Sequence, residues 1–362
     1  MKSKDCVKAL LTPGGRSERI GLYENIWPDT LSKWENEGYP CDPDDEPPQE
    51  YFDFDICRIS RTFDVYPLIG VHELVDQNEE WSIYRNGAGA ALKYWNNKSG
   101  TPEHVDFRMI SPDAWKKDYR SHLLFLDPKR FDLDESRKAF SRLKELGKWI
   151  CFNSAFIWET MRQSMGDVCM YESLALEPDW IHDYNEVYTQ FFIKHYTYLF
   201  EHVGLPDGVW LSEDLGYKNG LFCSPAMLDE FFKPYYKELV NYFHSLGLKV
   251  ILHSCGGITE ALPFILDIGF DALHPMERKA GCDPLAYAKK YGDRLAFIGG
   301  LDTRVLESGD RSLIRHETET LMNGMKDLGA RYFFASDHSV STLVSFESYK
   351  YALEVYKENR YY

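Results

Sequence analysis

The alternation of short apolar runs with helix-type stretches in the second part of the chain constrains its fold most strongly. Strand-like runs are expected at 149–152, 208–211, 248–252, 270–274, 295–300 and 331–335. Amphipathic periodicity predicts helices at 183–203, 225–244, 258–267, 310–327 and 345–357. Strands that alternate with helices in this way form parallel βαβ units. The pattern therefore predicts a single α/β domain with a closed (β/α)8 barrel, and an open doubly wound sheet is the less favoured alternative.

The first part of the chain is less regular. We expect residues 1–145 to form an irregular extension that includes the first barrel elements and packs on the barrel, which residues 146–362 mainly build. Short alternating strands are predicted at 51–55 and 81–85. Gly87–Ala90 then indicates a hairpin turn that leads into 92–95, and 42–48 reads as an acidic, proline-rich loop. The two parts are expected to make one structural domain.

Composition narrows the classes of partner. The chain has 362 residues, of which 44% are hydrophobic, and a formal net charge of -16. Such an acidic surface argues against nucleic acids and anionic membranes as partners, because binding to phosphates requires a basic face. No apolar run approaches the roughly 20 residues that cross a bilayer. No secretory signal is recognised, and the eight scattered cysteines are expected to be mostly free thiols, so the expected location is cytoplasmic.

Polar residues gather where the predicted strands end, which is the catalytic end of such a barrel. They are Asn153, Glu213, Asp214, His253, Cys255, His274, Asp302, Asp337 and His338. Among them, His253-Ser254-Cys255-Gly256-Gly257 directly follows the apolar run 248–252. An imidazole nitrogen and a thiolate sulfur together suit zinc, and the two glycines allow a tight turn. His274, which precedes Pro275, is expected to be a hydrogen-bonded histidine of the barrel.

Four segments of the second half resemble the uroporphyrinogen decarboxylase superfamily. They are Leu221–Pro225, His253–Gly256, Ile298–Thr303 and Phe334–His338, with looser similarity at Arg19–Trp27 and Tyr51–Asp55. The resemblance implies a (β/α)8 barrel with N-terminal additions. One branch of the superfamily contains metal-free decarboxylases of a tetrapyrrole with eight carboxylates. The other contains zinc methyltransferases that work with corrinoid proteins, and several of them carry a His-x-Cys-Gly motif.

This chain looks like the methyltransferase branch. The resemblance implies that zinc is held by His253 and Cys255 and that His338 is the third ligand, with a fourth position left open. The implied reaction moves a methyl group between a small O-methyl or thiol substrate and the cobalt of a corrinoid carried by a partner protein. With two imidazoles and one thiolate the zinc site would keep a net charge of +1, which slightly favours the release of an oxygen leaving group.

The other polar residues at the strand ends supply candidate catalytic groups. Glu213 is expected to be a ligand, a group that orients an imidazole, or a proton carrier. Asp214, Asp302 and Asp337 are expected to support the ligands.

Two other functions remain open. A decarboxylase-like lyase would need several arginines, and Gly14–Arg19 offers two of them without the surrounding motif. A non-catalytic barrel that binds a corrinoid or another small ligand would keep His253, Cys255 and His338 too far apart to share one ion.

Overall fold

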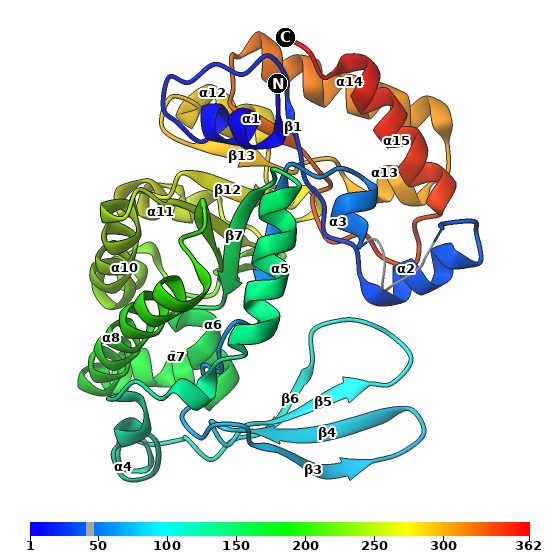
Figure 1. Cartoon of the computed structure of the whole chain (residues 1–362). Coiled ribbons are helices and arrows are strands. Elements are labelled where there is room, and N and C mark those ends of the chain that lie inside the picture. Colours follow the sequence, from blue (N-terminus) through cyan, green and yellow to red (C-terminus); the bar gives the residue numbers. More distant parts are fainter. Residues whose placement is uncertain (41–46) are drawn as a thin grey trace.

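Eight parallel strands form the barrel of the computed structural model, which describes residues 1–40 and 47–362 (Figure 1). In chain order they are β1 (Gly21–Leu22), β2 (Ile56–Ser60), β7 (Trp149–Ser154), β8 (Gly208–Ser212), β11 (Lys249–Ser254), β12 (Ala272–Pro275), β13 (Ala296–Ile298) and β14 (Tyr332–Phe334). From β2 to β14 each of these strands pairs with the next one along the chain, and β1 pairs with β14. The predicted (β/α)8 barrel is therefore confirmed.

The seam between β1 and β2 is closed by a buried ion pair. The Asp55 N–H donates to the Leu22 carbonyl at 2.8 Å, and the Leu22 N–H donates to the Asp55 carboxylate at 2.8 Å. Arg19 donates two hydrogen bonds to the same carboxylate, at 2.6 and 2.7 Å. Both residues come just before their strands, so the pair lies at the end of the barrel opposite to the catalytic end.

Helices cover the outside of the barrel. Those after the first two strands are α2 (Pro28–Glu35), α3 (Pro48–Tyr51), α4 (Pro112–Ala114) and α5 (Leu133–Glu145). Those after β7 and β8 are α6 (Ile157–Met165), α7 (Asp167–Leu176), α8 (Pro178–Val203), α9 (Pro225–Met227) and α10 (Lys233–Ser245), the last two joined by a π-helical turn. The remaining ones are α11 (Leu262–Ile268), α12 (Pro284–Tyr291), α13 (Thr303–Glu307), α14 (Arg311–Asp327) and α15 (Phe346–Asn359).

Apolar side chains form two layers. The inner layer fills the barrel with residues such as Tyr23, Trp210 and Ile251, and helix α1 (Ser3–Leu10) adds Val7 and Leu10 to it. The outer layer lies between strands and helices. Strands of a parallel barrel are covered on both faces, which explains why they read as nearly continuous apolar runs.

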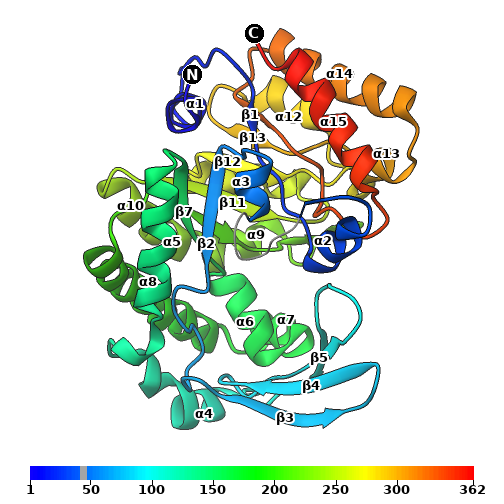
Figure 2. The same cartoon turned by 45° about the vertical axis from the view of Figure 1, so that its right-hand side comes forward.

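An antiparallel sheet is inserted between β2 and α5. Its strands are β3 (His72–Gln77), β4 (Trp81–Asn86), β5 (Ala91–Trp95) and β6 (Glu103–Asp106), paired in that order. The sheet lies at the end of the molecule far from both chain termini (Figures 1 and 2). The predicted strands at 81–85 and 92–95 and their turn are thus confirmed.

Other expectations for the N-terminal part were wrong. Residues 51–55 do not form a strand, because α3 ends at Tyr51 and Asp53 takes a left-handed φ of 57°. The alternation there instead buries Phe52 and Phe54, and Asp55 closes the barrel seam. Helix α5 was also missed within a stretch expected to be irregular. The predicted acidic loop at 42–48 falls mostly on residues 41–46, which lie outside the described residues.

Two further expectations concern membranes and thiols. No helix of the described chain combines the length and the apolar character that crossing a bilayer requires. The seven cysteines in residues 1–40 and 47–362 all have free thiols, as expected.

Candidate metal centre

The His-x-Cys motif lies at the carboxyl end of β11. His253 pairs in register with Ser212 of β8 and with His274 of β12, and Ser254 is the last residue of the strand. Cys255 follows, and Gly256 turns the chain with a φ of 84°. A Cβ atom on Gly256 would come within 2.3 Å of the Gly216 carbonyl carbon, so only glycine fits this turn.

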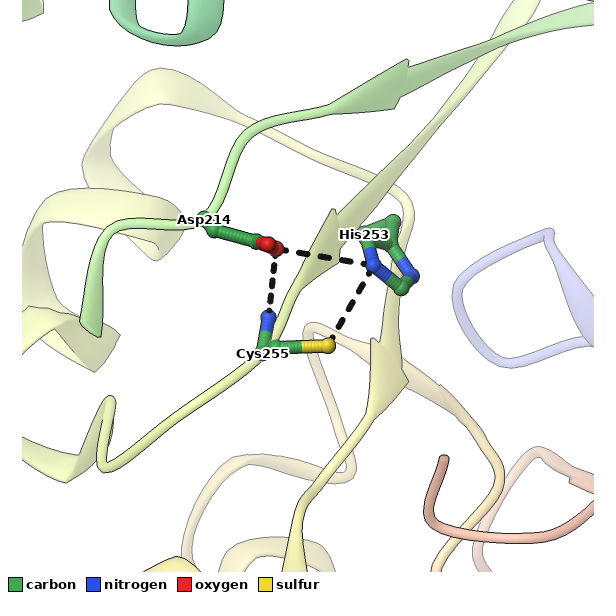
Figure 3. Close-up of side chains that lie close together, drawn as sticks. All are labelled: Asp214, His253 and Cys255. Carbon is green, nitrogen blue, oxygen red and sulfur yellow. Dashed lines mark hydrogen bonds and ion pairs between the residues drawn. The ribbon is translucent and has the colours of Figure 1, made fainter. Parts of the chain in front are cut away.

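Three donor atoms converge beside this turn. Asp214, His253 and Cys255 each offer one ligand atom, and these atoms lie within 4.8 Å of one another (Figure 3). His253 Nε2 is 3.4 Å from Cys255 Sγ and 3.5 Å from Asp214 Oδ1. A tetrahedral zinc with bonds of about 2.0–2.3 Å separates its ligands by about 3.3–3.6 Å. These two distances match this spacing, and the third pair of donor atoms lies within 4.8 Å, so the group is compatible with a zinc ion.

Backbone and side-chain contacts hold the donors in place. The Cys255 N–H donates to Asp214 Oδ1 at 3.0 Å, and the Gly256 N–H donates to the Glu277 carboxylate at 2.8 Å. His253 Nδ1 lies 2.6 Å from His274 Nδ1, so one ring donates to the other. This contact leaves His253 Nε2 to face Asp214 and Cys255, as expected of an imidazole ligand whose second nitrogen is fixed by a neighbour.

Burial controls the charge state of these groups. Burial lowers the pKa of His253 to about 4, against the opposing charge of Asp214, so the ring is neutral at pH 7 and able to bind a metal. Burial and then the charges of Asp214 and Glu277 raise the pKa of the Cys255 thiol. A bound divalent cation reverses the second effect, because it stabilises the thiolate directly. All three groups can therefore act as ligands when a divalent cation is bound.

Glu213 turns away from the three donors, although it directly precedes Asp214. Its carboxylate is fully buried and accepts hydrogen bonds from the N–H groups of Phe156 and Trp158 and from the Tyr236 hydroxyl. Burial raises its pKa to about 8, although these three donors oppose the shift. The carboxylate fixes the loop after β7, and its proposed catalytic role stays a prediction.

Asp302 and Asp337 lie at neighbouring strand ends. Asp302 caps α13 and pairs with Arg304 at 2.5 Å, and this guanidinium lowers the pKa of Asp302. The buried Asp337 accepts from the backbone N–H groups of Arg278 and Thr303 at 2.8 and 2.9 Å. Both carboxylates therefore organise loops, and the catalytic role expected for Asp302 stays a prediction.

His338 is not a member of the converging group. Its Nδ1 is 3.5 Å from the Ser339 carbonyl, and its ring packs edge-on against Trp27 with 6.0 Å between ring centroids. It does lie near the site, since its charge adds to the effect of burial in lowering the pKa of His253 and His274. His338 as a ligand stays a prediction, and Asp214 takes the third position in the geometry observed.

Two members of the site were assigned other roles from the sequence. Asp214 was expected to support the ligands, and His274 was expected to be an ordinary barrel residue. A signal existed for Asp214, because it follows the strand that neighbours β11, and the carboxyl ends of neighbouring parallel strands meet at one edge.

The barrel and its site define a (β/α)8 protein with three potential metal ligands at the catalytic end. Residues 170–359, more than half of the chain, match the uroporphyrinogen decarboxylase (URO-D) family. The chain therefore belongs to this family. No curated protein matches the sequence significantly.

Solved structures show similar folds. A methyltransferase from Methanosarcina mazei is 14% identical, with 99% of each chain covered and a TM-score of 0.68. At this identity the likeness supports the fold alone. A GH5-4 endoglucanase from Clostridium longisporum is 8% identical, with 90% of this chain and 88% of that chain covered. Its TM-score is 0.42, so the two folds agree only loosely.

Proposed function

We propose that the protein is a methyltransferase that uses zinc and acts with a corrinoid protein. In this proposal it moves a methyl group between a small O-methyl or thiol substrate and cobalt. The observation that carries the proposal is the convergence of Asp214, His253 and Cys255 within 4.8 Å at the catalytic end of a barrel of this family. The methyltransferase from Methanosarcina mazei, whose fold covers 99% of both chains, agrees with this choice.

Asp214, His253 and Cys255 would hold the zinc, and a fourth position would be left for the substrate. A zinc ion there supplies Lewis acidity, which lowers the pKa of a thiol or polarises the oxygen of a methyl ether. His274 orients His253 through the contact between their Nδ1 atoms, and the Cys255 N–H orients Asp214. The chain thus supplies both the ligands and the groups that position them.

The choice of Asp214 changes the charge of the centre. One carboxylate, one thiolate and one neutral imidazole would make a neutral zinc centre, whereas His338 in place of Asp214 would leave it positive. A neutral centre is a weaker Lewis acid, so the argument from charge for an oxygen leaving group no longer applies. A thiol and an O-methyl group are therefore both retained as the reacting group of the substrate.

The alternative functions receive less support. A decarboxylase acting on a tetrapyrrole needs several arginines at the catalytic end, yet Arg19 lies at the opposite end in its ion pair with Asp55. A purely ligand-binding barrel has no need for three potential metal donors within 4.8 Å of one another. Neither alternative accounts for the arrangement of Asp214, His253 and Cys255.

The first experiment is an elemental analysis of the purified protein and of Cys255→Ser. We expect about one zinc per chain in the wild type and its loss in the variant. Cys169→Ser is the matched control, because Cys169 is a half-buried thiol on α7. If the wild type holds no zinc even after zinc is supplied, the proposed mechanism is wrong. With zinc present, methyl transfer to a Co(I) corrinoid is then assayed with O-methyl and thiol substrates.

A further inference from the structure

Arg58 is a cation inside the barrel without an anionic partner. It lies in the middle of β2, where Cys57 and Ile59 pack in the outer layer and Ile56 packs in the barrel interior. Its guanidinium carbon is 5.0 Å from the centre of the Trp210 ring and 5.5 Å from that of Tyr23. Its hydrogen-bond partner is the Asn25 side-chain oxygen, at 2.6 Å. Among the described residues no carboxylate pairs with it, in contrast to Arg19, which Asp55 neutralises.

Two further polar atoms in the same layer have no partner. The Tyr23 hydroxyl and the Trp210 indole nitrogen are both buried, and neither makes a hydrogen bond within residues 1–40 and 47–362. They belong to the two rings on which Arg58 lies. A buried polar group without a partner costs about 1–3 kcal/mol. Two unpartnered polar atoms thus lie beside the Arg58 guanidinium.

A cavity of about 180 Å³ is lined by Arg58 together with Tyr23, Glu24, Asn25 and Ser60. This cavity lies along the first two strands of the barrel. Its volume is below the range of about 300–1,000 Å³ that is usual for pockets of drug-sized ligands. It therefore suits a small substrate, or one end of it.

Arg58 and the candidate metal centre belong to the same barrel interior. In the closed order of eight strands, β2 is two strands from β8, which Asp214 follows, and three strands from β11, which carries His253. Strand β12, which carries His274, lies opposite β2. The Trp210 ring contacts both groups, since its centre is 5.0 Å from the Arg58 guanidinium carbon and 5.0 Å from the centre of the His274 ring. His274 in turn contacts His253. A substrate held at Arg58 would therefore share the barrel interior with the metal ligands.

We propose that Arg58 binds a carboxylate of the substrate and thereby positions its methyl or thiol group toward Asp214, His253 and Cys255. This inference rests on the proposed function and names its substrate class, a small methylated compound or thiol that carries a carboxylate. A planar guanidinium binds a carboxylate through two parallel hydrogen bonds, which fixes orientation as well as affinity. The formal net charge of -16 opposes anions in general, so a single matched cation selects a singly charged group over a polyanion.

The test compares a carboxylate with its uncharged isostere. 3-Methoxybenzoate and 3-methoxybenzamide are titrated into the purified protein, and binding is followed by tryptophan fluorescence, since Trp210 lies beside Arg58. We expect the benzoate to bind at least about 10-fold more tightly than the amide. Arg58→Gln is expected to weaken binding of the benzoate by about 10–100-fold and to leave binding of the amide unchanged.

Two further variants complete the design. Arg58→Lys keeps the charge and is expected to recover part of the affinity. Arg311→Gln removes a half-exposed cation from the outer helix α14 and controls for the change in net charge, with no expected effect. The inference is overturned if Arg58→Gln binds the benzoate as the wild type does, if the amide binds equally well, or if the benzoate does not bind.

Zinc content, measured in the same samples, separates this inference from the proposed function. Zinc without carboxylate binding overturns only the role of Arg58. Carboxylate binding that depends on Arg58 in a protein that takes up no zinc supports the anion site and overturns the zinc methyltransferase.

Discussion

The assignment of Asp214 as the third metal ligand gives the sharpest prediction. Asp214→Asn removes the negative charge and replaces a carboxylate oxygen by an amide oxygen, which is a weaker metal ligand. The amide oxygen still accepts the hydrogen bond from the Cys255 N–H, which is 3.0 Å long in the wild type. The side chain keeps its volume, and about 39% of it is exposed to solvent, so the fold should tolerate the change. The variant therefore reports on ligation rather than on folding.

The magnitude follows from the number of ligands. Structural zinc sites with four ligands bind the ion with about 10–16 kcal/mol, or about 2.5–4 kcal/mol per ligand. Loss of one ligand should weaken zinc binding by roughly 100- to 1,000-fold. His338→Gln is the matched comparison, because His338 lies near the site but outside the converging group. It should change the affinity by less than about 10-fold.

The assay is competition for zinc between the protein and a chelating dye, at pH 7 and fixed ionic strength. Cobalt(II) in place of zinc adds an optical readout, because a thiolate ligand gives a charge-transfer band. The band should persist in both variants, since both keep Cys255. If Asp214→Asn binds zinc like the wild type while His338→Gln loses it, then the geometry has been misinterpreted and His338 is the ligand, as the family resemblance implied.

The remaining predictions concern the barrel seam and the buried carboxyl group of Glu24. Asp55→Asn breaks the buried pair with Arg19 and should lower the free energy of unfolding by about 3–5 kcal/mol in urea titrations. Asp53→Asn, at an exposed carboxylate two residues away, should cost less than about 1 kcal/mol, and equal effects of the two would refute the role of the buried pair. Burial raises the pKa of Glu24 to about 7 from an ordinary 4.5, so the folded state binds this proton more tightly than the unfolded state. The stabilisation is present at low pH and is lost as the pH rises from about 4.5 through 7, by about 2–3 kcal/mol between pH 5 and 8. Glu24→Gln should remove this part of the pH dependence, and an unchanged slope in urea titrations at pH 5 and 8 would contradict it.

Much of the barrel could be predicted because its strands are recognisable locally. A run such as Lys249–Ser254 is buried on both faces, so its apolar character shows in the sequence without knowledge of its neighbours. Strand β2 was missed because Arg58 interrupts its apolar run and Ser60 ends it. Strand β1 has two residues and leaves almost no pattern. Local patterns thus identified the longer apolar strands and failed where polar residues enter the barrel interior.

The site could be predicted only in part, for a different physical reason. His253 and Cys255 were identified because both lie in one segment, where the end of a strand and the following turn fix their relation. Glu213 and Asp214 are adjacent in the chain, but β8 ends just before them and the alternation of faces ends with it. The sequence could not show that Glu213 turns to the N–H groups of Phe156 and Trp158 while Asp214 turns to the metal donors.

The sequence by itself determined the barrel class, the location of the site at the strand ends and the two donors of the His-x-Cys motif. These features depend on periodicity and on residues near one another in the chain. The tertiary structure decided that Asp214 completes the donor group, that His274 holds His253, and that Arg58 shares the barrel interior with them. Those relations depend on which strands are neighbours or opposites and on their register. Contacts of this kind join residues far apart in sequence, and no local pattern encodes them.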